Sequence, residues 1–259
     1  MIPFWGTILG ATCVFFTGRN ASAALRRGIH GFSAGVMVAA SVWSLLIPSM
    51  EMAADRGATG ALSVLPAAIG LFLGIIFFLI CDRIIERKRD SALLSGNGRV
   101  LPPDFISYFA IALHNLPEGM AVGAVFAEIL RGSDAPETAM SAGFALSVGI
   151  AVQNFPEGAI VSVPLCARGK SKPRSFLWGA LSGIVEPVGA VLTIFAAGIA
   201  IPLLPYLLGF AAGAMLYAVL DGFAENTVCE EEKRWASAIT ALTFSVGFVA
   251  MMSLDVILG

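Results

Sequence analysis

The chain of 259 residues is 57% hydrophobic and only 13% charged, with a net charge of −2 and a mean hydropathy of +0.84. Soluble domains carry roughly 25% charged residues, so this composition excludes an ordinary soluble protein and indicates an integral membrane protein. The unbroken apolar runs of about twenty residues favour membrane-spanning helices over a β-barrel, whose strands alternate and are shorter.

Eight hydrophobic segments follow one another and predict an all-α protein with eight transmembrane helices. Each is near or above the roughly twenty residues that cross a bilayer, except for a slightly short first segment. The segments are residues 2–17, 29–52, 61–82, 104–130, 138–167, 175–200, 202–224 and 235–258. We expect all 259 residues to form one domain, with a charged, flexible cytoplasmic linker at about 83–103.

The placement of Lys and Arg predicts the orientation in the membrane. Only Arg56 and Arg131 fall in loops that follow even-numbered segments, and the other 14 of the 16 lie in loops that follow odd-numbered segments. By the positive-inside rule, the odd-numbered loops are cytoplasmic and both termini are extracytoplasmic.

A polar motif interrupts the fourth and fifth segments. His114-Asn115-Leu116-Pro117-Glu118-Gly119 is nearly repeated as Gln153-Asn154-Phe155-Pro156-Glu157-Gly158. Residues three and four apart share a helix face, so each motif gathers its polar side chains on one side. Because the two helices run in opposite directions, the repeat predicts inverted symmetry around a midplane site, as in many secondary transporters.

Three carboxylates fall near the midpoints of their segments: Glu118, Glu157 and, beside Pro187, Glu186. A charged residue at the bilayer centre costs about 2.5–3.5 kcal/mol on insertion scales. None of the eight segments contains Lys or Arg, so the compensating charge must come from protons or bound cations. Imidazole, carboxylate and amide ligands suit divalent zinc, iron or manganese.

At these motifs the chain resembles the ZIP (Zrt/Irt-like) family of divalent metal transporters. The matching stretches are HNLPEGMAVG at 114–123, QNFPEGAIVSVPL at 153–165 and Glu186-Pro187-Val188-Gly189. The run from Gly35 to Leu45 resembles the second helix of the bacterial GufA-like branch of that family.

The resemblance implies a secondary transporter, not an enzyme, that imports Zn2+ and also Fe2+, Mn2+ or Cd2+ into the cytoplasm by alternating access. It implies a multi-pass protein of the bacterial inner membrane whose partners are metal ions, lipid and a second copy of the chain, with no nucleic acid. The metal site would lie between the second, fourth, fifth and sixth helices and could hold two ions.

The resemblance also implies a ligand set for each ion. The first ion would be bound by Met37, His114, Glu118, Gln153 and Glu157. The second would be bound by Asn115, Glu118, Asn154, Glu157 and Glu186. Because Gln153 and Asn154 are neutral amides where many members have His and some have Asp, we expect a single tightly bound metal to lie nearer His114.

Two other classes of function compete with metal transport. An intramembrane metal-dependent hydrolase needs a general base and an open metal position, but the sequence has no HExxH motif. A proton-coupled transporter of organic solutes would need a midplane Arg or Lys, which is missing. At the helix ends, Glu51, Asp82, Glu225 and Asp255 are by default solvated, and a role in metal entry or exit stays open.

Overall fold

A computed structural model of the protein describes residues 1–17, 22–95, 103–130, 136–225 and 233–258. The described residues form helices and turns and contain no strand. The helices are α1 (Ile2–Ala11), α2 (Cys13–Phe16), α3 (Ala23–Ala40), the π-helix η1 (Ser41–Leu46), α4 (Ile47–Asp55), α5 (Ala61–Ser95), α6 (Pro103–Leu130), α7 (Pro136–Ala167), α8 (Lys172–Ser182), α9 (Val185–Phe195), α10 (Ala197–Glu225) and α11 (Lys233–Leu258).

Helix is present in every one of the eight predicted segments, which confirms the all-α class. Six helical stretches in the described residues are long and apolar enough to cross a membrane. They are Ala24–Asp55, Ala61–Ile84, Gly143–Ala167, Lys172–Phe195, Ala197–Leu220 and Ser237–Ile257. The first segment is a shorter apolar helix over Ile2–Phe16, and the fourth forms the 28-residue α6. The chain is therefore a multi-pass membrane protein, and the eight spans remain a prediction.

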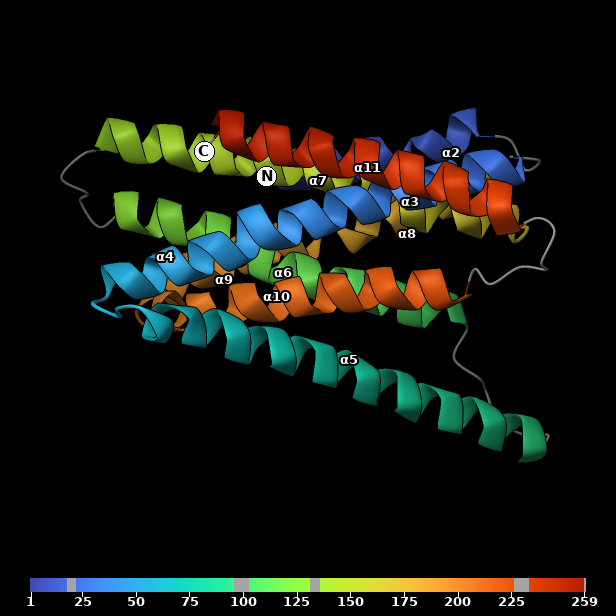
Figure 1. Ribbon diagram of the computed structural model, residues 1–259, viewed down its shortest axis with the longest axis horizontal. Coiled ribbons are helices and arrows are strands. Elements are labelled where there is room, and N and C mark those ends of the chain that lie inside the picture. Colours follow the sequence, from blue (N-terminus) through green and yellow to red (C-terminus); the bar gives the residue numbers. More distant parts are fainter. Residues whose placement is uncertain (18–21, 96–102, 131–135, 226–232, 259) are drawn as a thin grey trace.

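The helices form one elongated bundle, in which successive long helices alternate in direction (Figure 1). Four pairs of helices pack most extensively: α1 with α7, α6 with α9, α3 with α11, and α5 with α10. In each pair a glycine lies directly against the partner's backbone, where a Cβ would overlap a carbonyl oxygen. These contacts are Gly6 on Ala151, Gly119 on Glu186, Gly35 on Phe244 and Gly70 on Tyr206. Small residues allow this close packing, which replaces the hydrophobic effect inside lipid.

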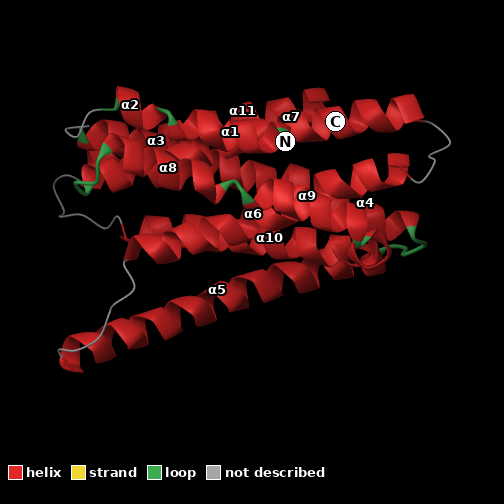
Figure 2. Cartoon of the chain, turned by 180° about the vertical axis from the view of Figure 1, so that it is seen from behind, coloured by secondary structure: helices red, strands yellow, loops and turns green. Residues whose placement is uncertain are grey.

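Helix α5 is longer than predicted. It continues to Ser95, so the first part of the predicted 83–103 linker is helical, whereas residues 96–102 lie outside the described part. The reason is that residues 83–95 contain no Gly or Pro and consist largely of helix-favouring Ala, Leu, Glu, Lys and Arg. Figures 1 and 2 show α5 at the edge of the bundle, diverging from α10 toward its C-terminal end.

Three of the helical rods are irregular. The first turns at Thr12, between α1 and α2, and the sixth is interrupted at Gly183 and Ile184, between α8 and α9. The second widens into the π-helix η1. Pi-helical turns and broken membrane helices are frequent at functional sites. The break before α9 lies directly beside Glu186, whereas η1 packs on α3, α4, α10 and α11.

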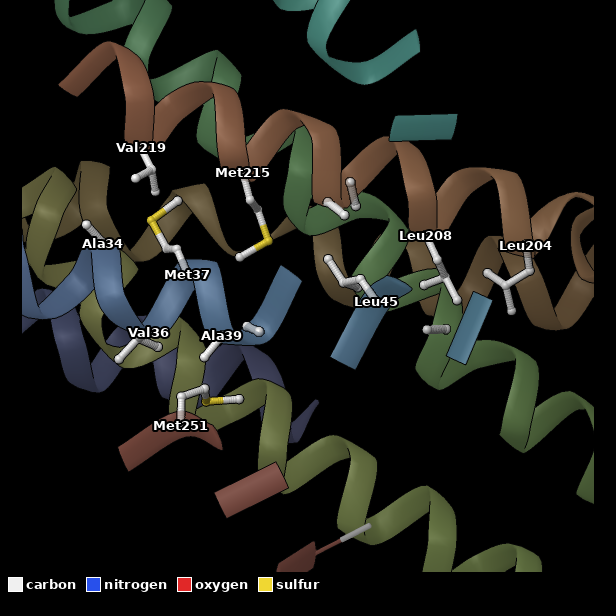
Figure 3. Close-up of a cluster of buried hydrophobic side chains, with 14 of the residues drawn as sticks. Ala34, Val36, Met37, Ala39, Leu45, Leu204, Leu208, Met215, Val219 and Met251 are labelled. Carbon is white, nitrogen blue, oxygen red and sulfur yellow. The ribbon is translucent and has the colours of Figure 1, made fainter. Parts of the chain in front are cut away.

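A hydrophobic cluster joins α3, α6, α10 and α11 around three buried methionines, Met37, Met215 and Met251. Figure 3 shows Met37 pointing from α3 toward Met215 and Val219 of α10. The α6 residues in this cluster are small, Ala121 and Ala124. The cluster is therefore apolar, and it joins α6 to helices of two other closely packed pairs, α3 with α11 and α5 with α10.

Candidate metal centre

Buried polar side chains converge from four helices. Each is at most 2% exposed: Thr7 on α1, Asn115 and Glu118 on α6, Gln153, Asn154 and Glu157 on α7, and Glu186 on α9. Glu118 lies close enough to Glu157 and Glu186 for their charges to interact, and Asn115 contacts Glu186 directly. The structure thus brings together six of the eight residues predicted from the sequence.

The two proline motifs shape the backbone at this place. Pro117 and Pro156 are buried inside α6 and α7, and both helices continue through them. Because proline has no N–H, the carbonyls of Leu113 and Val152 lose their intrahelical partner. Each motif helix therefore has one backbone carbonyl, next to its polar face, that accepts no hydrogen bond from its own helix.

Glu186 owes its position to the break between α8 and α9. It lies in the first turn of α9, where the unpaired N–H groups of a helix favour a negative charge. Its Oε1 accepts hydrogen bonds from Thr7 Oγ1 at 3.0 Å and from Asn115 Nδ2 at 3.4 Å. Its Oε2 has no hydrogen-bond partner among the described residues. One oxygen of this carboxylate is anchored, and the other is left for a ligand.

Glu118 has no hydrogen bond to either carboxylate oxygen within the described part of the chain. Gln153 lies close to it, but neither polar atom of Gln153 or of Asn154 has a partner of normal geometry among those residues. Buried polar groups in native proteins are nearly always satisfied, so a cluster of orphan acceptors calls for an ion or water. An oxygen-rich set of carboxylates and amides can bind a divalent cation.

A small cavity of about 10 Å³ lies beside Glu186, close to the smallest space that holds one water molecule. Its walls include Pro3 and Phe4 of α1, Gly119 of α6 and Pro187 of α9. The carboxylate is therefore buried against α1 with room for very little solvent.

Two predicted ligands stand apart from this group. The backbone of His114 lies in α6, but its side chain falls outside the described part of the structure. Met37 is 5% exposed and packs in the hydrophobic cluster, so it stays a predicted ligand. Among the described side chains, no three His, Cys, Asp or Glu residues form a metal site by themselves. A metal here would need the amide oxygens as well.

The acidic residues at the helix ends differ from one another. Asp255 of α11 accepts a hydrogen bond from Ser44 Oγ in η1 at 2.7 Å, and Asp82 of α5 accepts one from Tyr217 of α10. Glu51 is exposed, and the side chain of Glu225 is not among those described. Asp82 and Asp255 are thus tied to neighbouring helices and are not simply solvated.

Sequence reasoning missed Thr7 and Gly183. A Cβ at Gly183 would lie 2.6 Å from Thr7 Oγ1 and 2.8 Å from Glu186 Oε1, so this glycine makes room for their hydrogen bond. A threonine and a glycine in apolar helices are common, and neither belongs to a motif. The sequence signal that could have indicated this contact is Gly183, three residues before Glu186 in an apolar segment.

A bundle of membrane helices that encloses carboxylates and amides with no Lys or Arg in its apolar segments has the features of a cation transporter. A family model described as ZIP Zinc transporter matches residues 88–255, which is more than half of the chain. This protein belongs to the ZIP family, as its motifs predicted.

Several curated relatives support this assignment. Human zinc transporter ZIP11 is 33% identical, over 98% of this chain and 95% of its own length. Zinc transporter GufA of Myxococcus xanthus is 33% identical, over 84% of this chain and 81% of its own. Zinc transporter ZIPB of Bordetella bronchiseptica is 31% identical, over 99% and 79% respectively. Membership in a family of transporters favours transport over the hydrolase alternative.

Proposed function

We propose that this protein imports divalent metal ions, chiefly zinc, across the bacterial inner membrane into the cytoplasm. The observation that carries the proposal is the group of three buried carboxylates, Glu118, Glu157 and Glu186, in segments without Lys or Arg. Divalent cations neutralise such a group and also satisfy its open acceptors. The names of the relatives, all zinc transporters, support zinc as the main substrate.

The ligands proposed for the first ion are Met37, His114, Glu118, Gln153 and Glu157. Those proposed for a second ion are Asn115, Glu118, Asn154, Glu157 and Glu186. Burial of the carboxylates and amides at one place supports the shared glutamates as bridges between the ions. Neutral amides at 153 and 154 lower the ligand charge, which is compatible with Fe2+, Mn2+ or Cd2+ as further substrates.

The proposed topology has eight membrane spans in an inverted repeat, with both termini extracytoplasmic. Two matching sets of contacts support it. Gly119 packs on the backbone of Glu186 as Gly158 packs on that of Thr7, and Gly189 packs on Leu116 as Gly10 packs on Phe155. An inverted repeat that exchanges α6 with α7 and α9 with α1 would produce this correspondence, with Thr7 in the place of Glu186.

Alternating access requires two groups of helices that move relative to each other. Helices α1, α6, α7, α8 and α9 pack mainly among themselves, as do α3, α4, α5, α10 and α11. Between the two groups, α6 packs on α10, and the cluster there is apolar and includes Ala121, Ala124 and Met215, which suits sliding. In the second group, α5 and α11 are the least covered helices, with 22% and 11% of their apolar windows buried. They are the surfaces proposed for contact with lipid and with a second copy of the chain.

The experiment is a wild-type transport assay. The purified protein is reconstituted into liposomes that enclose an indicator responding to each divalent ion tested, and Zn2+, Fe2+, Mn2+, Cd2+ or Mg2+ is added outside. We expect zinc to enter fastest and Mg2+ not to enter, because Mg2+ releases its water shell reluctantly. Zinc that binds to the protein without entering the liposomes would contradict the proposal and would favour a metal-dependent enzyme.

A further inference from the structure

Thr7 makes an unusual hydrogen bond for a threonine inside a helix. Such hydroxyls commonly donate to a carbonyl three or four residues earlier in their own helix. Thr193 of α9 does this toward Gly189 O at 3.0 Å, and Thr243 of α11 toward Ile239 O at 2.8 Å. Thr7 instead donates across to Glu186 Oε1 on α9, at 3.0 Å.

The surroundings of Thr7 are built for this contact. Thr7 is fully buried, Gly158 of α7 lies directly against its backbone carbonyl, and Gly183 leaves the space in which its hydroxyl meets Glu186. Any side chain at Gly183 would displace one of the two groups. The close approach of α7 at Gly158 and the space left at Gly183 therefore let the Thr7 hydroxyl reach the Glu186 carboxylate.

The consequence for Glu186 is an asymmetric carboxylate. Oε1 accepts from Thr7 and from Asn115, whereas Oε2 has no partner among the described residues. Hydrogen bonds of this kind orient a ligand and fix which of its atoms faces the metal. The neutral hydroxyl adds no charge that would oppose a cation.

We propose that Thr7 is a positioning residue of the metal centre: its hydroxyl anchors Oε1 of Glu186 so that Oε2 is available to the cation. The inference rests on the proposed function, because it assumes that Glu186 binds the transported metal. It extends the site to α1, which contributes none of the predicted ligands.

The test is equilibrium binding of Zn2+ to the purified protein in detergent. Thr7→Val removes the hydroxyl at nearly constant size, and Thr7→Ser keeps the hydroxyl. Loss of a group that orients a metal ligand typically weakens metal affinity by about tenfold to a hundredfold. We expect that loss in Thr7→Val for the ion that Glu186 binds, and near-normal affinity in Thr7→Ser.

Thr193→Val is the matched control, because Thr193 is also fully buried but bonds within its own helix. It should bind zinc like the wild type. In a Glu186→Gln background, Thr7→Val should cause no further loss, since two residues that act through one contact are not additive. If Thr7→Val does not fold, Thr7→Ala supplies the same test with a smaller side chain.

Wild-type affinity in Thr7→Val, an equal loss in Thr193→Val, or a full additional loss in the Glu186→Gln background would each overturn the inference. Glu118→Gln and Glu157→Gln separate this failure from failure of the proposed function. If these two variants lose zinc binding while Thr7→Val retains it, only the role of Thr7 is wrong. If both bind zinc normally, the metal centre itself is wrong.

Discussion

Gly119 lies directly against the carbonyl oxygen of Glu186, where a Cβ would overlap it. This contact sets how closely α6 approaches α9, and it therefore determines where Glu118 stands relative to Glu186. Because the backbone fixes where a Cβ lies and the atom it would meet is a backbone carbonyl oxygen, no rotation of a side chain can relieve the overlap.

Gly119→Ala should therefore push α6 away from α9, lower thermal stability and strongly reduce zinc uptake. Gly149→Ala in α7 is the matched control, since nothing lies within 4 Å of a Cβ at that position. It should leave uptake intact and stabilise the helix by up to about 1 kcal/mol. Thermal unfolding in detergent and uptake in liposomes measure both effects, and equal behaviour of the two variants would refute the argument.

Glu118→Gln should make the metal-free protein more stable. Neither oxygen of Glu118 has a hydrogen bond among the described residues, and an ionised carboxylate in the bilayer centre costs about 2.5–3.5 kcal/mol. The amide removes that charge at the same size, so at a pH high enough to ionise Glu118 in the metal-free protein the melting temperature should rise. Zinc should then no longer raise it further, because binding is lost. Glu51→Gln at an exposed position should change neither quantity, and a lower melting temperature for Glu118→Gln would contradict this reasoning.

Arg56 stabilises the start of α10. Pro205 has no N–H to give to the carbonyl of Ile201, and Arg56 Nη2 donates to that carbonyl at 2.6 Å while Nη1 donates to Pro202 O at 2.9 Å. Arg56→Met should cost about 1 kcal/mol, a modest value because the arginine is exposed.

Pro205→Ala restores the missing N–H, so it should recover part of the stability lost in Arg56→Met. The measurement is the melting temperature of the two single variants and the double variant. If the effects of the two substitutions on the melting temperature simply add in the double variant, Arg56 does not act through the free carbonyl.

Asp255 offers a test of metal entry at the end of α11 predicted to face outward. It accepts a hydrogen bond from Ser44 in η1, so Asp255→Asn can keep that contact while removing the negative charge. If this charge draws in cations, uptake at low zinc should fall by up to about tenfold, with little change at saturating zinc. Initial rates over a range of zinc concentrations decide this, and an equal loss at every concentration would exclude a role confined to entry.

Much of the fold follows from local sequence. Apolar runs of membrane length predicted the helices, because lipid leaves helices as the structure that satisfies every backbone group of a single segment. The paired motifs predicted where a metal site would lie, since carboxylates such as Glu118 and Glu157 are costly to bury in a membrane without a proton or a cation. Six of the eight predicted ligands, including Gln153 and Asn154, lie together in the structure, and their role as ligands stays a prediction.

The remaining features depend on contacts between helices that are distant in sequence. Thr7 and Glu186 are 179 residues apart, and the sequence around Thr7 contains no motif that predicts their hydrogen bond. The sequence placed Arg56 in a loop, and only the structure shows that it donates to the carbonyl of Ile201, which Pro205 leaves without a helical partner. The extension of α5 to Ser95 was missed because hydropathy ends the segment where charge begins, whereas helix propensity continues.

The most direct test of the account is the initial rate of zinc influx into proteoliposomes for Glu118→Gln and Glu157→Gln, compared with Glu51→Gln. All three replace a carboxylate by an amide of equal size, so they differ in whether the charge is buried in the metal centre. We predict that Glu118→Gln and Glu157→Gln remain folded but lose zinc influx, while Glu51→Gln transports at the wild-type rate. Influx at the wild-type rate in both buried variants would contradict the claim that these carboxylates carry the metal across the membrane.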